Sequence, residues 1–230
     1  MRTLPLALGL LLFLPLTALA QELTPLDLST VAQEGKRPED FVPKGWKVDA
    51  TSQGDLDKNG SEDVVLELVE DKPAASEEET PIHRARALLV LLSSEGGKLR
   101  RAGSSNRVLY CTSCQGMYGG DDGDGVVKLD KGIIIIDQFT GSRQWVLRTT
   151  LRFRYDPKER RFMLIGEDVE RTDRLADSTK SQSTNLLTGA KVTEERQHDE
   201  KLGKDRILSS KKEKVEVHKR YLEDVNIAAY

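Results

Sequence analysis

Residues 55–63 carry oxygen-bearing side chains at the spacing of a calcium-binding loop. Three aspartates and an asparagine alternate with other residues, and Gly60 permits a sharp turn before the last carboxylate. Calcium prefers six to eight oxygen ligands at roughly 2.3–2.6 Å, and a short acidic loop supplies many of them. The predicted calcium ligands are the side chains of Asp55, Asp57, Asn59 and Asp63, together with the backbone carbonyl of Ser61.

The residues around this loop decide which kind of calcium motif it is. A helical EF-hand loop needs a bidentate glutamate at its twelfth position, which Leu66 occupies here, so the EF-hand is excluded. The aliphatic run at 64–69 is typical of a β-strand. The alternative without a metal is a hairpin turn at Asn59-Gly60. Three carboxylates so close together repel one another without a cation, which favours the metal site.

The whole pattern, Gly-Asp-x-Asp-x-Asn-Gly-x-x-Asp followed by aliphatic residues, resembles the strand–loop–strand calcium motif of FG-GAP and VCBS-type repeats. In that family the first, third, fifth and ninth loop positions bind the ion. The resemblance assigns these positions to Asp55, Asp57, Asn59 and Asp63. The family usually strings several copies into a propeller, whereas this chain has one convincing copy, so we expect a single β-rich domain.

Cys111 and Cys114 form a C-x-x-C pair and are the whole cysteine complement. Two closely spaced cysteines in an exported chain are typical of a local disulfide, which is the pairing we expect. A redox-active pair and half of a zinc site are the alternatives. Zinc needs two further ligands, and the three histidines are scattered along the sequence, so a zinc site is not expected.

A second acidic segment, 119–125, contains Asp121, Asp122 and Asp124. These carboxylates suggest a second calcium site, but their irregular spacing favours a solvated turn before a strand that starts at Val126.

The clearest strand pattern lies at 145–155, where apolar residues and arginines alternate. Arg148, Arg152 and Arg154 share one face of this strand. Such a stripe binds an anionic polysaccharide, a phosphate-bearing polymer or an acidic protein when it is free. The alternative is a solvated face that pairs with acids such as Glu167 and Glu170 on the next strand.

Residues 1–20 have the features of a secretory signal peptide. A positive charge at Arg2 precedes an apolar core, and small residues predict cleavage after Ala20. No cysteine stands at that site, so no lipid anchor is expected, and no later apolar run is long enough to span a membrane. We therefore expect a periplasmic or secreted protein. The formal net charge of −3 argues against nucleic acid as a partner.

The expected fold is mainly β, an antiparallel meander sheet or a sandwich, with a short N-terminal helix and a charged C-terminal extension. Three parts are expected after the signal peptide: a polar segment at 21–44 with the helix at 26–33, a β-rich domain at 45–193, and a charged segment at 194–230 with an edge strand at 215–218. Strands are predicted at 64–70, 85–92, 107–110, 133–136, 145–155 and 162–165, and a hairpin at 183–192.

The order of these pieces resembles a group of exported bacterial proteins that share a Phe-x-Pro-x-Gly-Trp segment, here 41–46, and a Thr-Asn-Leu-Leu-Thr-Gly stretch, here 184–189. That resemblance covers most of residues 40–193 and implies no activity. We therefore expect an exported calcium-binding envelope protein that acts as a binding or structural module, with an envelope protein or polysaccharide as its partner. The alternative is an enzyme, either an envelope hydrolase or a thiol-disulfide oxidoreductase that uses the C-x-x-C pair.

Overall fold

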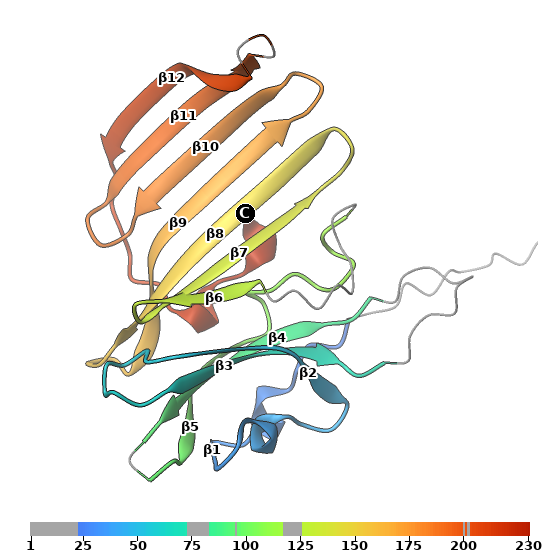
Figure 1. Cartoon of the computed structure of the whole chain (residues 1–230), viewed down its shortest axis with the longest axis vertical. Coiled ribbons are helices and arrows are strands. Elements are labelled where there is room, and N and C mark those ends of the chain that lie inside the picture. The colour runs from blue at the N-terminus through green and yellow to red at the C-terminus, as the bar shows by residue number, and fades with distance from the viewer. Residues whose placement is uncertain (1–22, 73–82, 95, 117–125, 200, 202) are drawn as a thin grey trace, which may run out of the picture.

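The computed structural model describes residues 23–72, 83–94, 96–116, 126–199, 201 and 203–230. The predicted signal peptide and the acidic residues Asp121, Asp122 and Asp124 lie outside these ranges. The described residues form two antiparallel sheets, one of five strands and one of seven (Figure 1). The expectation of a mainly β, antiparallel protein is therefore confirmed.

The first sheet has the strand order β1-β5-β4-β3-β2. Its strands are β1 (Glu34–Gly35), β2 (Trp46–Gly54), β3 (Asp63–Glu70), β4 (Arg86–Ser93) and β5 (Leu99–Ser105). Every residue of β3 is buried, and so is β4 as far as Leu92. Their nearly continuous aliphatic runs suit this position, because the two central strands are covered on both faces.

The second sheet is a meander in which each strand pairs with its neighbours in sequence, from β6 to β12. Its strands are β6 (Val127–Asp130), β7 (Ile133–Gly141), β8 (Trp145–Asp156), β9 (Arg161–Asp173), β10 (Ser178–Asn185), β11 (Ala190–Asp199) and β12 (Lys204–Lys214). The alternation predicted for 145–155 is confirmed: Leu147, Leu151 and Phe153 are buried, whereas Arg148 and Arg154 are exposed. The predicted hairpin at 183–192 is confirmed by the pairing of β10 with β11.

One apolar core lies between the two sheets, where Val65, Leu88 and Val90 of the first sheet pack with Ile136 and Phe153 of the second. The C-terminal residues close this core through the 3-10 turns η3 (Leu222–Asp224) and η4 (Ile227–Ala229).

A second core covers the opposite face of the first sheet. There Leu26, Val31 and Phe41 of the N-terminal segment pack on Leu66 and Leu89. The two cores together account for the burial of β3 and β4 on both faces.

The second sheet continues beyond the inter-sheet core as strands β10 to β12 (Figure 1). All of β12 is exposed except Glu213, which is half-buried. The ion pair Lys180–Glu195 links the neighbouring strands β10 and β11 there, and Arg196–Glu170 links β11 to β9 across β10. The expected charged extension therefore belongs to the sheet as far as Lys214. The boundary predicted between residues 193 and 194 lies inside β11.

Three predicted elements differ in the structure. The helix expected at 26–33 is a single 3-10 turn, η1 (Leu28–Thr30), because the backbone is already extended at Val31, whose side chain enters the second core. The predicted edge strand at 215–218 is wrong, since β12 is the edge and the chain then leaves the sheet to bury Leu222.

The strand predicted at 107–110 is also wrong. Val108 and Leu109 are buried, but their segment pairs with no strand in the described part of the chain. The side chain of Gln138 replaces a neighbouring strand: its Oε1 accepts a hydrogen bond from Tyr110 N at 2.9 Å and its Nε2 donates to Val108 O at 2.9 Å. The buried backbone is satisfied in this way without a ladder.

Candidate metal centre

The predicted calcium loop connects β2 to β3 at one end of the first sheet. Leu56 is 2% exposed and anchors the loop in the inter-sheet core. The backbone turns through positive φ angles at Lys58 (66°) and Gly60 (84°). Glycine adopts this conformation without steric cost, whereas other residues rarely do, so Gly60 suits the reversal between the ligand positions.

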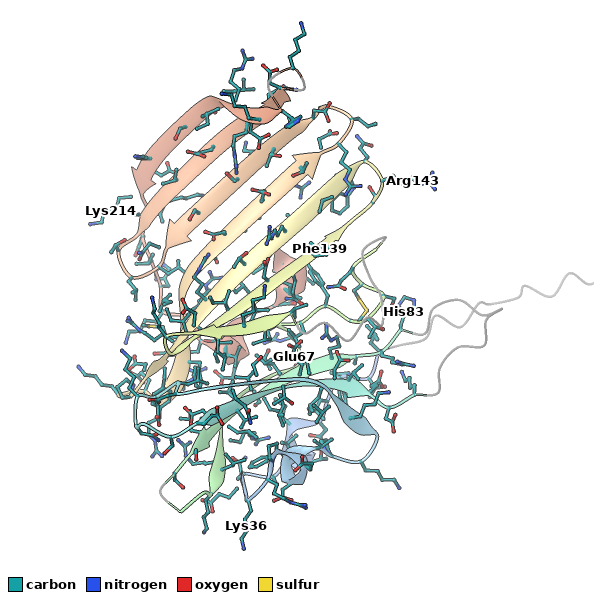
Figure 2. All side chains as sticks on the ribbon, viewed as in Figure 1. Lys36, Glu67, His83, Phe139, Arg143 and Lys214 are labelled. Carbon is teal, nitrogen blue, oxygen red and sulfur yellow. A yellow bond between two sulfur atoms is a disulfide. The ribbon has the colours of Figure 1, made fainter. Side chains whose placement is uncertain are left out.

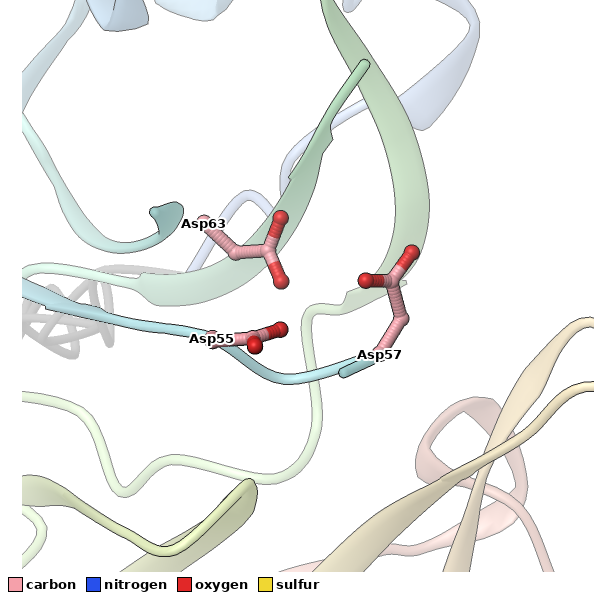
Figure 3. Close-up of side chains that lie close together, drawn as sticks. All are labelled: Asp55, Asp57 and Asp63. Atoms are coloured by element: carbon pink, nitrogen blue, oxygen red, sulfur yellow. The ribbon is translucent and has the colours of Figure 1, made fainter. Parts of the chain in front are cut away.

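The loop brings Asp55, Asp57 and Asp63 together. One carboxylate oxygen from each lies within 4.8 Å of the others. Figure 3 shows the three side chains directed toward a common space. Hard divalent cations take carboxylate oxygens in such an arrangement, and calcium suits a flexible set of oxygen ligands better than magnesium does.

Backbone amides hold these carboxylates in place. Asp55 Oδ1 accepts a hydrogen bond from Lys58 N at 2.7 Å. Both oxygens of Asp63 accept hydrogen bonds of 2.7 Å, one from Leu56 N and one from Ser93 N at the end of β4. Each oxygen of Asp63 accepts one of these bonds and has a further lone pair for a cation, whereas Asp55 Oδ1 accepts a second hydrogen bond, from Asn59 N at 3.2 Å.

Asp63 is fully buried. Burial raises the pKa of its carboxyl, the amides of Ser93 and Leu56 oppose that rise, and the negative charge of Asp57 adds to it. Keeping Asp63 ionised beside another carboxylate costs free energy unless a positive charge lies nearby. A divalent cation held by the loop would supply that charge.

Asn59 and Ser61 lie on the same turn as the aspartates. Asn59 Oδ1 accepts a hydrogen bond from Ser61 N at 2.7 Å, and its Nδ2 donates to Ser93 O at 2.9 Å. Asn59 therefore connects the loop to the end of β4, and its oxygen has a second lone pair for a cation.

A cavity of about 500 Å³ lies beside the loop. Its wall includes Asp57 and Lys58 from the loop, Arg154 and Lys158 from the β8–β9 hairpin, and Lys219 from the C-terminal segment. Lys219 Nζ lies 3.8 Å from Asp156, whereas Lys58, Arg154 and Lys158 have no ion-pair partner within the described ranges. The cavity wall therefore carries an excess of positive charge, from four basic side chains against the carboxylates of Asp57 and Asp156.

The other arginines of β8 are paired. Arg148 Nε donates to Asp137 at 2.9 Å, and Arg152 lies 2.7 Å from Asp168. The expected partners Glu167 and Glu170 instead pair with Arg220 and Arg196. Of the predicted arginine stripe, Arg154 alone lines the cavity.

Cys111 and Cys114 form a disulfide with an S–S distance of 2.00 Å, as expected. It lies in a turn that packs against β7, where Thr140 Oγ1 donates to Cys114 O at 2.9 Å. His83 lies on the same side of the molecule (Figure 2), and its Nδ1 is hydrogen-bonded to Ser113 Oγ. The sequence analysis missed this contact, because 30 residues separate the two partners.

Sequence reasoning also missed a buried charged pair. Glu67 is 1% exposed and interrupts the aliphatic run of β3, and Arg86 of β4 lies 2.9 Å from it. A charged residue within an otherwise apolar central strand was the signal for this pair, since an ionised side chain is rarely buried without a partner.

In the described part of the chain, no helix has the length and apolar character needed to cross a membrane. Comparison of the whole chain with protein-family models, curated proteins and solved structures finds no match. The chemistry of the residues themselves therefore carries the functional argument.

Proposed function

We propose that this protein is an exported, calcium-stabilised β domain of the bacterial envelope, and that it acts as a binding module for an anionic polysaccharide. The convergence of Asp55, Asp57 and Asp63 around one space is the observation that carries the calcium site. The resemblance of the loop to FG-GAP and VCBS-type motifs supports the choice of calcium. The predicted signal peptide and the disulfide support an exported location.

In this proposal calcium has a structural role. The loop makes contacts to the end of β4 through Asp63 and Asn59, and to the core through Leu56. A cation held by the three aspartates relieves their mutual repulsion and fixes the junction between β2 and β3. Binding that favours the folded state stabilises the protein by mass action.

The neighbouring cavity provides the binding surface. Among the residues that the structure describes, Lys58, Arg154 and Lys158 have no ion-pair partner, and Asp57 belongs to both the loop and the cavity wall. Calcium offsets the negative charge of the loop, so that the lysines and the arginine dominate the local potential. Carboxylate or sulfate groups of a polysaccharide are therefore attracted to the cavity, and the arginine fork binds such groups in bidentate fashion.

The calcium site is tested by thermal unfolding with and without calcium. At a calcium concentration about 100 times Kd, the expected stabilisation is about 2.7 kcal/mol, with a corresponding rise in Tm. The double variant Asp55→Ala/Asp57→Ala should lose this rise. Asp130→Ala, which removes an exposed carboxylate from the neighbouring β6, is the matched control and should keep it. An unchanged melting curve of the unmodified protein in millimolar calcium contradicts the proposal.

The binding surface is tested separately with an oligogalacturonate probe in calcium-containing buffer, measured by calorimetry. Arg154→Ala/Lys158→Ala should weaken binding at least tenfold, equivalent to about 1.4 kcal/mol. Lys212→Ala is the control. It removes an exposed charge from the edge strand β12, which does not line the cavity, and it should leave the affinity unchanged. Equal effects of these two variants would remove the cavity from the proposal.

A further inference from the structure

The two sulfur atoms of the disulfide differ in their surroundings. Cys111 is 6% exposed, whereas Cys114 is an exposed residue. A thiolate arriving from solvent therefore reaches the Cys114 sulfur more easily. The Cys111 sulfur is then the leaving group, and the rate of exchange rises when the leaving thiolate is stabilised.

A hydrogen-bonded chain leads to the leaving sulfur. Ser113 Oγ lies 3.7 Å from Cys111 Sγ and is hydrogen-bonded to His83 Nδ1. With a proton on Nδ1, His83 donates to Ser113, and the Ser113 hydroxyl is left to donate to Cys111 Sγ. His83 and Ser113 thus form a hydrogen-bonded network that ends at the sulfur of Cys111. A disulfide that serves only as a staple does not require such a donor.

A cavity of about 290 Å³ lies against the disulfide and is mainly apolar. Both cysteines line it, together with Leu109, Tyr110, Ile227 and Ala228. An apolar side chain next to an incoming cysteine fits this space, and burial of that side chain positions the attacking thiolate beside Cys114.

We propose that the Cys111–Cys114 disulfide is a thiol-exchange site whose partner is an exported polypeptide with two cysteines and an apolar residue next to one of them. This activity is independent of the calcium site. It uses the disulfide as the oxidant, so that no other co-reactant is needed for one turnover.

In the first step the partner's thiolate attacks Cys114 Sγ. The Cys111–Cys114 bond breaks, a mixed disulfide forms at Cys114, and Cys111 leaves as a thiolate that accepts the hydrogen bond from Ser113. In the second step the partner's other thiolate attacks its own half of the mixed disulfide and releases Cys114 as a thiolate. The partner loses two electrons and becomes a disulfide, while Cys111 and Cys114 gain them and take up protons from solvent.

The rate of exchange in the full chain tests the proposal. The probe is a reduced synthetic peptide with two cysteines and a leucine beside the first, and a matched peptide carries glutamate in place of leucine. The leucine peptide should reduce the disulfide about tenfold faster than the glutamate peptide. Ser113→Ala should slow the reaction about tenfold, because the leaving thiolate loses its donor. Ser113→Thr keeps a hydroxyl and should restore the rate, and His83→Ala should slow it.

Two measurements separate this role from a structural one. The oxidised forms of all three variants should melt at the temperature of the unmodified protein, which shows that the fold is intact. Single-cysteine variants identify the attacked sulfur: the thiol of the Cys111→Ser variant should form a mixed disulfide with an oxidised probe peptide about tenfold faster than that of Cys114→Ser. Equal rates for the two single-cysteine variants would overturn the proposal. So would a Ser113→Ala rate equal to the unmodified rate, or reduction only in denaturant.

Discussion

Arg86 Nη2 lies 2.9 Å from Glu67 Oε2 in an ion pair whose side chains are 7% and 1% exposed. Glu67 also accepts hydrogen bonds from Val126 N at 3.2 Å and Val127 N at 3.1 Å, at the start of β6. One carboxylate thus links adjacent strands of the first sheet to the first strand of the second.

The first prediction concerns removal of this carboxylate. Glu67→Ala leaves Arg86 buried with only the half-buried Asp49 as a partner, and it leaves two backbone amides without an acceptor. We expect a loss of about 3–5 kcal/mol in the free energy of unfolding, measured by urea denaturation. The control is Glu195→Ala, whose exposed pair with Lys180 should cost less than about 1 kcal/mol. Comparable losses in the two variants would show that Glu67 has no special role.

The second prediction is a pH dependence. Burial raises the pKa of Glu67, and the Arg86 guanidinium opposes that rise without cancelling it. A carboxyl whose pKa is higher in the folded state binds its proton more tightly there, so its contribution to stability is complete below the unfolded pKa and is lost as the pH rises through the folded pKa. The unfolding free energy of the unmodified protein, relative to Glu67→Gln, should therefore fall as the pH rises from about 4.5. A difference that grows with pH would mean that the folded pKa is lowered instead.

The third prediction uses two glycines with the same backbone conformation. Gly60 lies in the predicted calcium loop and Gly45 precedes β2. Both have φ of +84°, and a Cβ at either position meets nothing within 4 Å. Replacement by alanine therefore costs only backbone strain, about 1–2 kcal/mol at each position in urea unfolding without calcium. Gly60→Ala should also raise the calcium Kd about tenfold, because it shifts the ligands on either side. Gly45→Ala should leave calcium affinity unchanged, and the same change in both variants would speak against a role for Gly60 in binding.

The fourth prediction concerns the free edge of the second sheet. Within the described ranges β12 pairs only with β11, and it carries five basic residues, Lys204, Arg206, Lys211, Lys212 and Lys214. Charged side chains on an edge strand oppose pairing with a second molecule. The variant Lys212→Thr/Lys214→Thr should therefore self-associate, as measured by sedimentation velocity, at concentrations where the unmodified protein is monomeric. Lys180→Thr, on the interior strand β10, is the control, and association of both variants would point to a general loss of charge as the cause.

Local sequence predicted a large part of the fold. The alternation along β8 and the aliphatic runs of β3 and β4 specify strands because their periodicity matches the pleat of a sheet. The convergence of the three aspartates was predicted for a similar reason. Its candidate ligands lie within nine consecutive residues, so that a short turn is enough to bring Asp55, Asp57 and Asp63 together.

Local sequence failed where distant segments replace local partners. The segment at 107–110 has the composition of a strand, but the side chain of Gln138 satisfies its backbone. Likewise the chain after β12 leaves the sheet because burial of Leu222 and Ile227 in the inter-sheet core outweighs the pairing of a short, charged strand. The competing contacts come from residues that no local pattern places nearby.

The sequence by itself determined that the chain is mainly β, that three aspartates are close enough in sequence to meet in one turn, and that its two cysteines are close enough to pair. Only the tertiary structure decided that Glu67 lies buried against Arg86 and that His83 and Ser113 adjoin the disulfide. It also decided that lysine and arginine side chains line the cavity beside the loop. The physical reason is that strand formation and turn geometry depend on neighbouring residues. Charge pairing and hydrogen bonding between distant segments depend instead on how the sheets pack.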